Sequence, residues 1–168
     1  MKTPMETKTE NGIKVNLGIE NKNLSQIYNI LNTVLADEYI LYTKTRNFHW
    51  NVVGRDFIQL HEFFEKQYEQ LNEVIDEVAE RTRSLGGKSN GSLKEFADQT
   101  RLQEILEKNL NSGQMLQILL KDHETIIQEL RQDSEKCEEL GDMGTNDFLV
   151  GIMETHEKMA WMIRAHIE

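Results

Sequence analysis

The chain has 168 residues, with 19 lysine and arginine residues against 29 aspartate and glutamate residues, which gives a formal net charge of −10. A field of that sign repels nucleic acids and anionic membranes, so it argues against a generic binder of either. The length suits one compact domain, and a single proline with 7% aromatic residues disfavours an all-β chain rich in turns. One cysteine cannot form an internal disulfide, so the composition favours the cytoplasm as the location.

Residues 1–22 are expected to form a flexible arm in front of a single domain over 23–168. The first 20 residues contain three lysines and three glutamates and show no clear period. They lack the apolar stretch of roughly 7–15 residues that a secretory signal needs, so no export is expected. The longest nearly unbroken apolar run, residues 148–153, is far shorter than the roughly 20 residues that span a bilayer, so no membrane partner is expected.

Apolar residues recur at helical spacing in four long segments, and this period predicts an all-α chain. The connection between the second and third segments is longer, and Ser92 and Glu95 within it have capping-box spacing, which predicts a short extra helix. Four long helices with one longer crossover are typical of a four-helix bundle. The long helices are predicted over about 24–50, 57–85, 112–140 and 146–167.

Residues that can cap a helix or end it predict where the helices begin and stop. A glycine after the second and third helices, Gly86 and Gly141, can adopt the left-handed conformation that ends a helix at least cost. Side-chain oxygens at the starts of helices accept hydrogen bonds from unpaired backbone amides. The expected caps are Asn23 paired with Gln26, Asp56, and Asn146.

Two histidines and three carboxylates form the constellation that carries chemistry. On the second predicted helix the spacings 61→65 and 76→80 are each one turn, and 65→76 is about three turns, so four of these side chains share one stripe. The fifth residue ends the first helix and lies across the hairpin from position 61. No histidine has a glutamate three residues before it, so the Glu-x-x-His pairs of the commonest di-iron bundles are missing. The candidates are His49, His61, Glu65, Asp76 and Glu80.

Distance along the helix decides where these residues can meet. Eleven residues at about 1.5 Å each put Asp76 about 16 Å from Glu65, whereas two ligands of one ion lie only a few ångströms apart. The two ends of the stripe meet only if two copies of the helix lie antiparallel about a two-fold axis near residues 70–71. Imidazole and carboxylate ligands without thiolate suit iron, manganese or zinc. The alternative interpretation is that these side chains belong to an ordinary helix surface.

Several short segments surround these residues: NFHWNVVG over 47–54, LHEFFE over 60–65, DEVAER over 76–81 and LGG over 85–87, together with Phe57. They resemble the signature of the Dps family, the mini-ferritins. The resemblance implies a ferritin-like four-helix bundle that assembles into a hollow homododecamer, with ferroxidase centres at the dimer two-fold axis. It implies that His49, His61 and Glu65 of one subunit meet Asp76 and Glu80 of the other.

The chemistry that the resemblance implies is the oxidation of Fe(II) and storage of Fe(III) as a mineral inside the shell. The resemblance implies hydrogen peroxide as the preferred oxidant, with dioxygen as the other one. The iron site is expected to be dinuclear, with zinc or manganese as possible substitutes. A protein of this kind protects the cell against oxidative stress.

Further acidic residues have both a functional and an ordinary interpretation. A row of glutamates beyond the candidate stripe would collect iron inside the shell, or would simply form a solvated helix face. Asp142 and Asp147 resemble acidic residues that line the family's three-fold pores. Asp147 is the better candidate because Asn146 is expected to start the helix, although an anion there also favours the helix terminus. The glutamate row consists of Glu62, Glu69, Glu73 and Glu77.

Binding to DNA is the alternative function, as a nucleoid-associated protein that shields DNA physically. Relatives that condense DNA often use a lysine-rich terminal arm, whereas the first 20 residues here sum to zero charge. Binding through counterion release needs clustered positive charge, so DNA binding is expected to be weak or absent.

Overall fold

A computed structural model describes the fold of residues 15–168. All regular structure in this range is helical, as the sequence predicts, and no helix in it is long and apolar enough to cross a membrane. Residues 1–14, most of the arm predicted over 1–22, lie outside the described residues. The helices are α1 (Asn21–Asn51), α2 (Phe57–Ser84), α3 (Leu93–Gln99), α4 (Ser112–Glu139) and α5 (Met143–Ile167).

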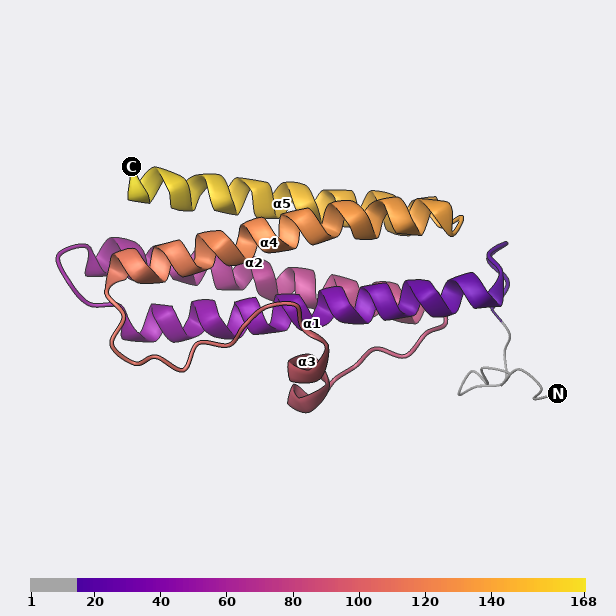
Figure 1. The fold of residues 1–168 in the computed structure, drawn as a ribbon, viewed down its shortest axis with the longest axis horizontal. Helices are drawn as coiled ribbons and strands as arrows, with labels where there is room; N and C mark the ends of the chain where they lie inside the picture. The colour runs from indigo at the N-terminus through magenta and orange to yellow at the C-terminus, as the bar shows by residue number, and fades with distance from the viewer. Residues whose placement is uncertain (1–14) are drawn as a thin grey trace.

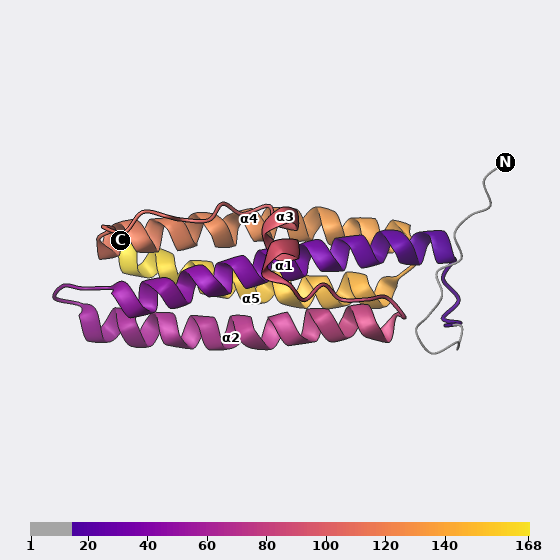
Figure 2. The same ribbon diagram turned by 90° about the horizontal axis from the view of Figure 1, so that it is seen from below.

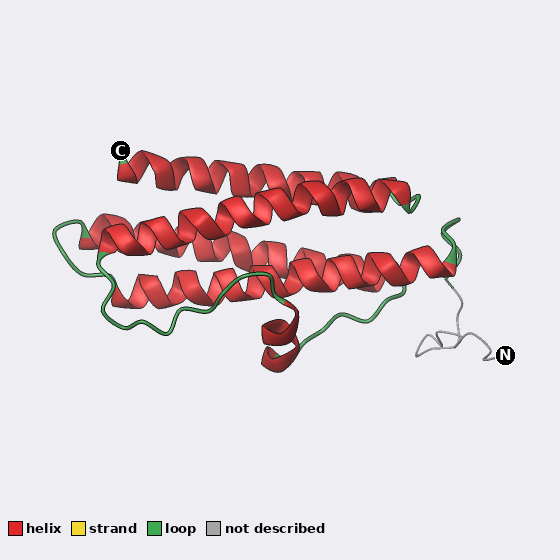
Figure 3. Cartoon of the chain, in the orientation of Figure 1, coloured by secondary structure: helices red, strands yellow, loops and turns green. Residues whose placement is uncertain are grey.

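The four long helices form two antiparallel hairpins, α1 with α2 and α4 with α5, packed against each other as a bundle (Figure 1). The crossover from α2 to α4 runs along the outside of α1 and carries α3, as the second view shows (Figure 2). The loops concentrate at the two ends of the bundle and in this crossover (Figure 3). The α1–α2 loop, the start of α4 and the C-terminus therefore share one end of the molecule.

Apolar side chains at helical spacing line the space between the helices. On α2, Leu60, Phe64, Leu71 and Val78 are buried, whereas Phe57 is partly exposed at the start of the helix. The candidate stripe thus lies beside the buried face of α2, and its side chains are not part of the core. The largest fully buried side chains are Phe48, Phe64, Ile27, Leu31, Leu35, Leu41, Leu71, Leu119, Ile126, Leu130, Leu149 and Met159.

Several predicted helix ends are confirmed. Ser92 and Glu95 form a reciprocal capping box at the start of α3, with each residue's backbone N–H donating to the other's side chain. Gly86 and Gly141 follow α2 and α4 with φ of +91° and +85°, a conformation that a side chain would strain. Asp56 occupies the N-cap position of α2, although its side chain makes no capping hydrogen bond.

Two predicted caps are wrong. α1 begins at Asn21, so Asn23 lies inside the helix, where its amide donates to the Leu140 carbonyl oxygen at 2.9 Å instead of capping. α5 begins at Met143, three residues before the predicted cap, because the Asp142 side chain accepts from the Thr145 N–H at 2.9 Å. Asn146 donates instead to the Ser134 carbonyl oxygen at 2.9 Å.

One arginine fastens the crossover to the bundle. The Arg101 guanidinium donates to Asp37 on α1 at 2.7 Å and to Glu129 and Asp133 on α4 at 2.9 Å each. The Asp37 side chain is only 1% exposed. Burial raises its pKa and the Arg101 charge opposes that rise, so removing the arginine leaves a buried carboxyl without its counter-ion.

The first prediction concerns this ion pair. Arg101→Gln should lower the free energy of unfolding by about 3 kcal/mol, because breaking a buried pair leaves Asp37 uncompensated. Urea unfolding at a fixed protein concentration measures the change. The control is Lys94→Gln, which breaks the exposed Lys94–Asp98 pair and should leave the midpoint nearly unchanged. Equal midpoints for the two variants would show that the Arg101 contacts contribute little.

Candidate metal centre

Two histidines stack face to face at the loop end of the α1–α2 hairpin. The ring centroids of His49 and His61 are 3.7 Å apart, and the ring planes differ by 21°. The Nδ1 atom of each ring lies 2.8 Å from the backbone oxygen of the other residue. Because a carbonyl oxygen only accepts, each Nδ1 carries a proton and donates it. In the neutral imidazole this tautomer leaves Nε2 with a bare lone pair, the state in which imidazole binds a metal.

The chain reaches this geometry through a short connection between the two helices. α1 ends at Asn51, and the next residue, Val52, is buried with its backbone N–H bonded to Phe48. Gly54 then adopts a φ of +126°, which lets the chain reverse within five residues. The tight reversal places the last turn of α1 directly against the first turns of α2. His49 is 7% exposed and His61 is half-buried, so the pair lies at the edge of the molecule.

A carboxylate follows the histidine pair one turn along α2. Glu65 is half-buried, and its Oε1 atom accepts a hydrogen bond from the Tyr68 hydroxyl at 3.2 Å. Burial raises the pKa of Tyr68 and the nearby Glu65 charge raises it further, so the phenol keeps its proton and is the donor. The Tyr68 ring also meets His49 edge-on, with centroids 5.2 Å apart. Tyr68 thus supports both kinds of candidate ligand.

The remaining two candidates lie at the far end of the same helix. Asp76 and Glu80 are exposed one turn apart on α2, and neither forms a hydrogen bond or ion pair within residues 15–168. Since α2 is one continuous helix, Asp76 is about 16 Å from Glu65 along its axis. In the described part of one chain, no three histidine, cysteine, aspartate or glutamate side chains converge closely enough to hold a metal. The five candidate ligands therefore fall into two separate groups within the described part of one chain.

The other acidic candidates differ in accessibility. All four glutamates of the row on α2, Glu62 among them, are exposed, and so is Asp147 in the first turns of α5. Asp142 is buried and already engaged, since it caps α5 and pairs with Arg81 at 3.1 Å. Of the two, Asp147 is thus the side chain that remains accessible on the described part of the chain.

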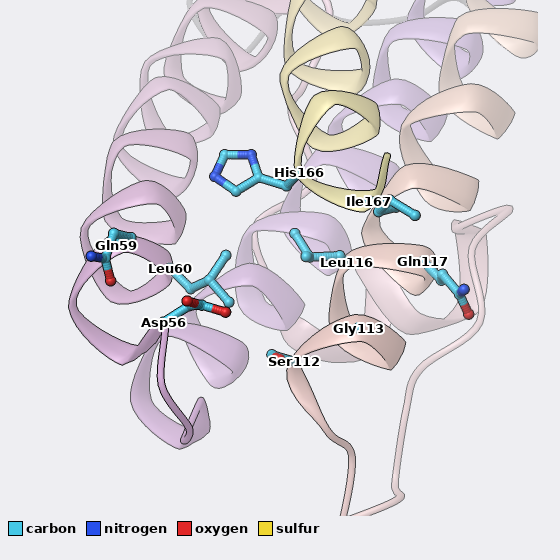
Figure 4. A pocket seen from close by; sticks show the side chains of 9 residues that line it. All are labelled: Asp56, Gln59, Leu60, Ser112, Gly113, Leu116, Gln117, His166 and Ile167. Atoms are coloured by element: carbon cyan, nitrogen blue, oxygen red, sulfur yellow. The ribbon is translucent and has the colours of Figure 1, made fainter.

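A cavity of about 460 Å³ lies at the same end of the bundle, where α2 and α4 begin and α5 ends. Figure 4 shows Asp56, Leu60, Leu116 and His166 pointing into it. The His166 ring is held from one side by Phe63, with centroids 4.4 Å apart. None of the five candidate ligands lines this cavity, so it is separate from the histidine pair.

Sequence reasoning assigned no role to two histidines that lie fully buried in the bundle. His156 on α5 contacts Glu38 Oε1 through Nε2 at 2.8 Å and His123 Nδ1 through its own Nδ1 at 2.8 Å. In the described chain the second oxygen of Glu38 and the Nε2 of His123 have no partner. Their positions in the sequence could have revealed them, because each of these polar residues interrupts an apolar stripe at helical spacing.

The buried, hydrogen-bonded side chains of Glu38, His156 and His123 make the free energy of unfolding depend on pH. Burial, and then the neighbouring His156, hold the pKa of His123 well below its usual value, so His123 is neutral in the folded protein. An unfolded histidine gains its proton near pH 6.5, so below that pH the unfolded chain binds more protons than the folded one. The free energy of unfolding should therefore fall as the pH drops below about 6.5, by up to about 1.4 kcal/mol per pH unit.

Denaturant unfolding between neutral pH and pH 5 measures this second prediction. His123→Leu should have a shallower dependence on pH than the unsubstituted chain, because the group that resists protonation is gone. The exposed His166 gives the control, since His166→Leu should keep the original slope. If His123→Leu and the unsubstituted chain lose stability in parallel, His123 is not the group responsible.

Comparison with known proteins identifies the family. A family model described as a ferritin-like domain matches residues 28–168. The chain is 39% identical over 142 residues to DNA protection during starvation protein 2 of Bacillus anthracis, which covers 84% of this chain and 97% of that protein. The chain belongs to the Dps family.

Solved structures of Dps proteins share the fold. DpsC from Streptomyces coelicolor is 32% identical, with a TM-score of 0.90 over 99% of this chain and 96% of that one. The Dps protein of Vibrio cholerae is 28% identical, with a TM-score of 0.86 over 93% of this chain and 98% of that one. The latter is described as a member of a broad superfamily of ferritin-like diiron-carboxylate proteins. The predicted ferritin-like fold is confirmed, and this Dps chain is a member of that superfamily.

Proposed function

We propose that this Dps protein is a ferroxidase that stores iron, oxidising Fe(II) at sites shared between two chains. The observation that carries the proposal is the histidine pair, whose hydrogen bonds to carbonyl oxygens leave both Nε2 atoms ready to bind. Asp76 and Glu80, exposed and unpaired within the described chain, supply the complementary half. These donors match the imidazole and carboxylate set that binds iron, with manganese or zinc as possible substitutes.

An antiparallel pair of α2 helices brings the two halves together. With a two-fold axis near residues 70–71, the half-site of His49, His61 and Glu65 on one chain meets Asp76 and Glu80 of its partner, and the reverse holds at the other end. Each dimer then has two dinuclear centres. We propose further that such dimers build a homododecameric shell, in the cytoplasm, with the ferric mineral inside.

In this scheme the protein positions iron and the iron supplies the electrons. Two ferrous ions bound side by side deliver two electrons to one molecule of hydrogen peroxide, which avoids the hydroxyl radical that one-electron reduction releases. Dioxygen is the alternative oxidant. The neutral imidazoles bind without adding charge, while the carboxylates of Glu65, Asp76 and Glu80 favour the more highly charged Fe(III) product. The fixed tautomers leave no imidazole reorientation to be completed on binding.

The charge distribution suits cation uptake. The chain carries a formal net charge of −10, which raises the local concentration of ferrous ions near its surface. The exposed Asp147 would draw ions through a three-fold pore, and the exposed glutamate row on α2, with Glu62 beside the histidines, would collect them inside the shell. Both assignments are part of the proposal.

The third prediction tests whether the site is shared. His61→Ala and Asp76→Ala assemblies should each lose most of the fast oxidation of Fe(II) by peroxide. Mixed dimers contain one intact site of two, because the chain with Asp76→Ala keeps its histidines and the chain with His61→Ala keeps its carboxylates. Random reassembly of equal amounts should therefore restore about a quarter of the sites, measured by stopped-flow absorbance of the ferric product.

A matched mixture provides the control. His61→Ala combined with His49→Ala damages the same half-site in both chains, so their mixed dimers hold no intact site and should recover nothing. Recovery in this control, or none in the first mixture despite confirmed mixed dimers, would contradict a site divided between the two ends of α2. Unchanged oxidation in both parent variants would show that iron is oxidised elsewhere.

Physical shielding of DNA is the second candidate, favoured by the name of the Bacillus anthracis relative. The charge of this chain opposes it, because neither the whole chain nor its first 20 residues have a positive excess. The fourth prediction is that the assembled protein gives no mobility shift of linear duplex DNA even at low salt. A strong shift that weakens as salt is added would instead make nucleic-acid binding a function of the protein.

A further inference from the structure

The cavity where α2 and α4 begin and α5 ends contains a carboxylate that the fold does not use. Asp56 occupies the N-cap position of α2, where an aspartate ordinarily accepts a hydrogen bond from a backbone N–H of the first turn. Its backbone angles, φ −97° and ψ 21°, are not the extended ones of such a cap, and its side chain makes no capping bond. The carboxylate also forms no ion pair within residues 15–168, and it points into the cavity (Figure 4). It is therefore available to a ligand.

An imidazole nitrogen without a partner belongs to the same cavity. The Nδ1 atom of His166 lies 2.9 Å from the Met162 carbonyl oxygen, which only accepts, so Nδ1 carries a proton and donates it. In the neutral imidazole this tautomer leaves Nε2 as a hydrogen-bond acceptor, and Nε2 has no partner in the described chain. The contact with Phe63, at 4.4 Å between ring centroids, holds the ring from one side. The two contacts together fix its orientation.

The rest of the lining is apolar or uncharged. Leu60 and Leu116, which are 4% and 5% exposed, provide an apolar wall, and Ile167 lies at the rim. No lysine or arginine lines this cavity in the described part of the chain. Its volume of about 460 Å³ is within the range of small-molecule sites and exceeds what a single bare ion fills. The cavity thus combines hydrogen-bond acceptors and one negative charge with an apolar surface.

We propose that this cavity binds a primary alkylammonium ion, supplied by a free aliphatic amine or short diamine. An ammonium group has three N–H donors and one positive charge, as in lysine. One N–H donates to the Asp56 carboxylate in a charge-assisted hydrogen bond, and a second donates to His166 Nε2. The alkyl stem lies on Leu60 and Leu116, as lysine stems lie on apolar surfaces. None of the five candidate iron ligands lines the cavity, so the site is independent of the proposed function.

Other classes of ligand match this lining less well. An anion would meet the Asp56 carboxylate with no lysine or arginine beside it. A transition-metal ion would find one imidazole and one carboxylate, whereas no three histidine, cysteine, aspartate or glutamate side chains of the described chain are placed to hold a metal. A neutral apolar molecule would cover the carboxylate without pairing it, which costs free energy.

The fifth prediction is that metal-free assembled protein binds 1,4-diaminobutane, measured by equilibrium dialysis of the labelled compound. At pH 8 an alkylamine is charged and an ordinary histidine is neutral. Asp56→Asn should weaken binding at least about tenfold, because it removes the charge-assisted bond. His166→Phe keeps an aromatic ring on Phe63 but lacks the acceptor nitrogen, and it should weaken binding about fivefold. The Asp56 side chain caps nothing, so Asp56→Asn should keep the unfolding midpoint of the unsubstituted chain.

A matched variant separates the site from general attraction to an acidic protein. Glu154→Gln removes one negative charge from an exposed position of α5, about 18 Å along the helix from His166, and should bind the diamine normally. Equal losses in Asp56→Asn and Glu154→Gln would show that the diamine follows only the net charge, and would overturn the proposal.

Two analogues of butylamine test how the group is recognised. Butyltrimethylammonium keeps the charge and the stem but has no N–H to donate, and 1-butanol keeps the stem without the charge. Each should bind at least about tenfold more weakly than butylamine, because each lacks the charge-assisted hydrogen bond. Equal binding of butylamine and butyltrimethylammonium would refute recognition through Asp56 and His166.

A lysine side chain carries the same group, so the source of the amine must be distinguished. If dissociated chains bind the diamine and the assembled protein does not, a neighbouring chain fills the cavity, and the assignment to a free amine is wrong. Binding of Zn²⁺ that both Asp56→Asn and His166→Phe abolish, without binding of amines, would also overturn it. His61→Ala should bind the diamine normally, so failure of the proposed iron centre would leave this site standing.

Discussion

Two hydrogen bonds between the side chain of one histidine and the backbone of the other govern the candidate centre. Because His49 and His61 each donate from Nδ1 to the other's carbonyl oxygen, neither ring can turn without breaking its own bond and exposing its neighbour's carbonyl. The same bonds choose the tautomer, and hence which nitrogen faces outward. They also join the last turn of α1 to the start of α2, so the ligand geometry is part of the hairpin itself.

The buried polar groups of the bundle core form hydrogen bonds with one another. Glu38, His156 and His123 form a fully buried hydrogen-bonded chain from α1 through α5 to α4. In the commonest di-iron bundles, carboxylates and histidines in the bundle core gather the metal. Here the buried groups are largely bonded to one another, and among the described residues no three histidine, cysteine, aspartate or glutamate side chains are placed to hold a metal ion. These hydrogen bonds link three helices and fix their relative register. Apolar packing alone specifies that register less tightly.

Much of this fold could be predicted from the sequence because helical period and glycine placement are local signals. The four long helices, the short helix at Ser92, and the ends at Gly86 and Gly141 all follow from them. The start of α5 could not, because the first apolar residues of its period come after a polar turn that is already helical. Asp142 starts that helix through a contact whose second partner, Arg81, is 61 residues away in the sequence.

The candidate site, too, could be predicted only where local signals determine it. Spacing predicted which side chains share a face of α2 and how far apart its two ends lie, and a continuous helix has just those properties. Spacing could not reveal the reciprocal histidine bonds, because they depend on the reversal at Gly54, nor the contact of Tyr68 with His49 across the hairpin. Both depend on which residues of two helices meet, and this register is set by packing over the whole hairpin.

The division of ligands between the two ends of α2 links chemistry to assembly. A lone chain holds three candidate ligands at one end and two at the other, and about 16 Å of rigid helix prevents them from meeting. Under the proposed function, an isolated chain binds iron weakly and leaves it in contact with water and peroxide. Under the same proposal, pairing would complete both centres at once, so fast oxidation would begin only in a dimer that can join a shell. The Fe(III) produced there would have the interior of the shell to enter.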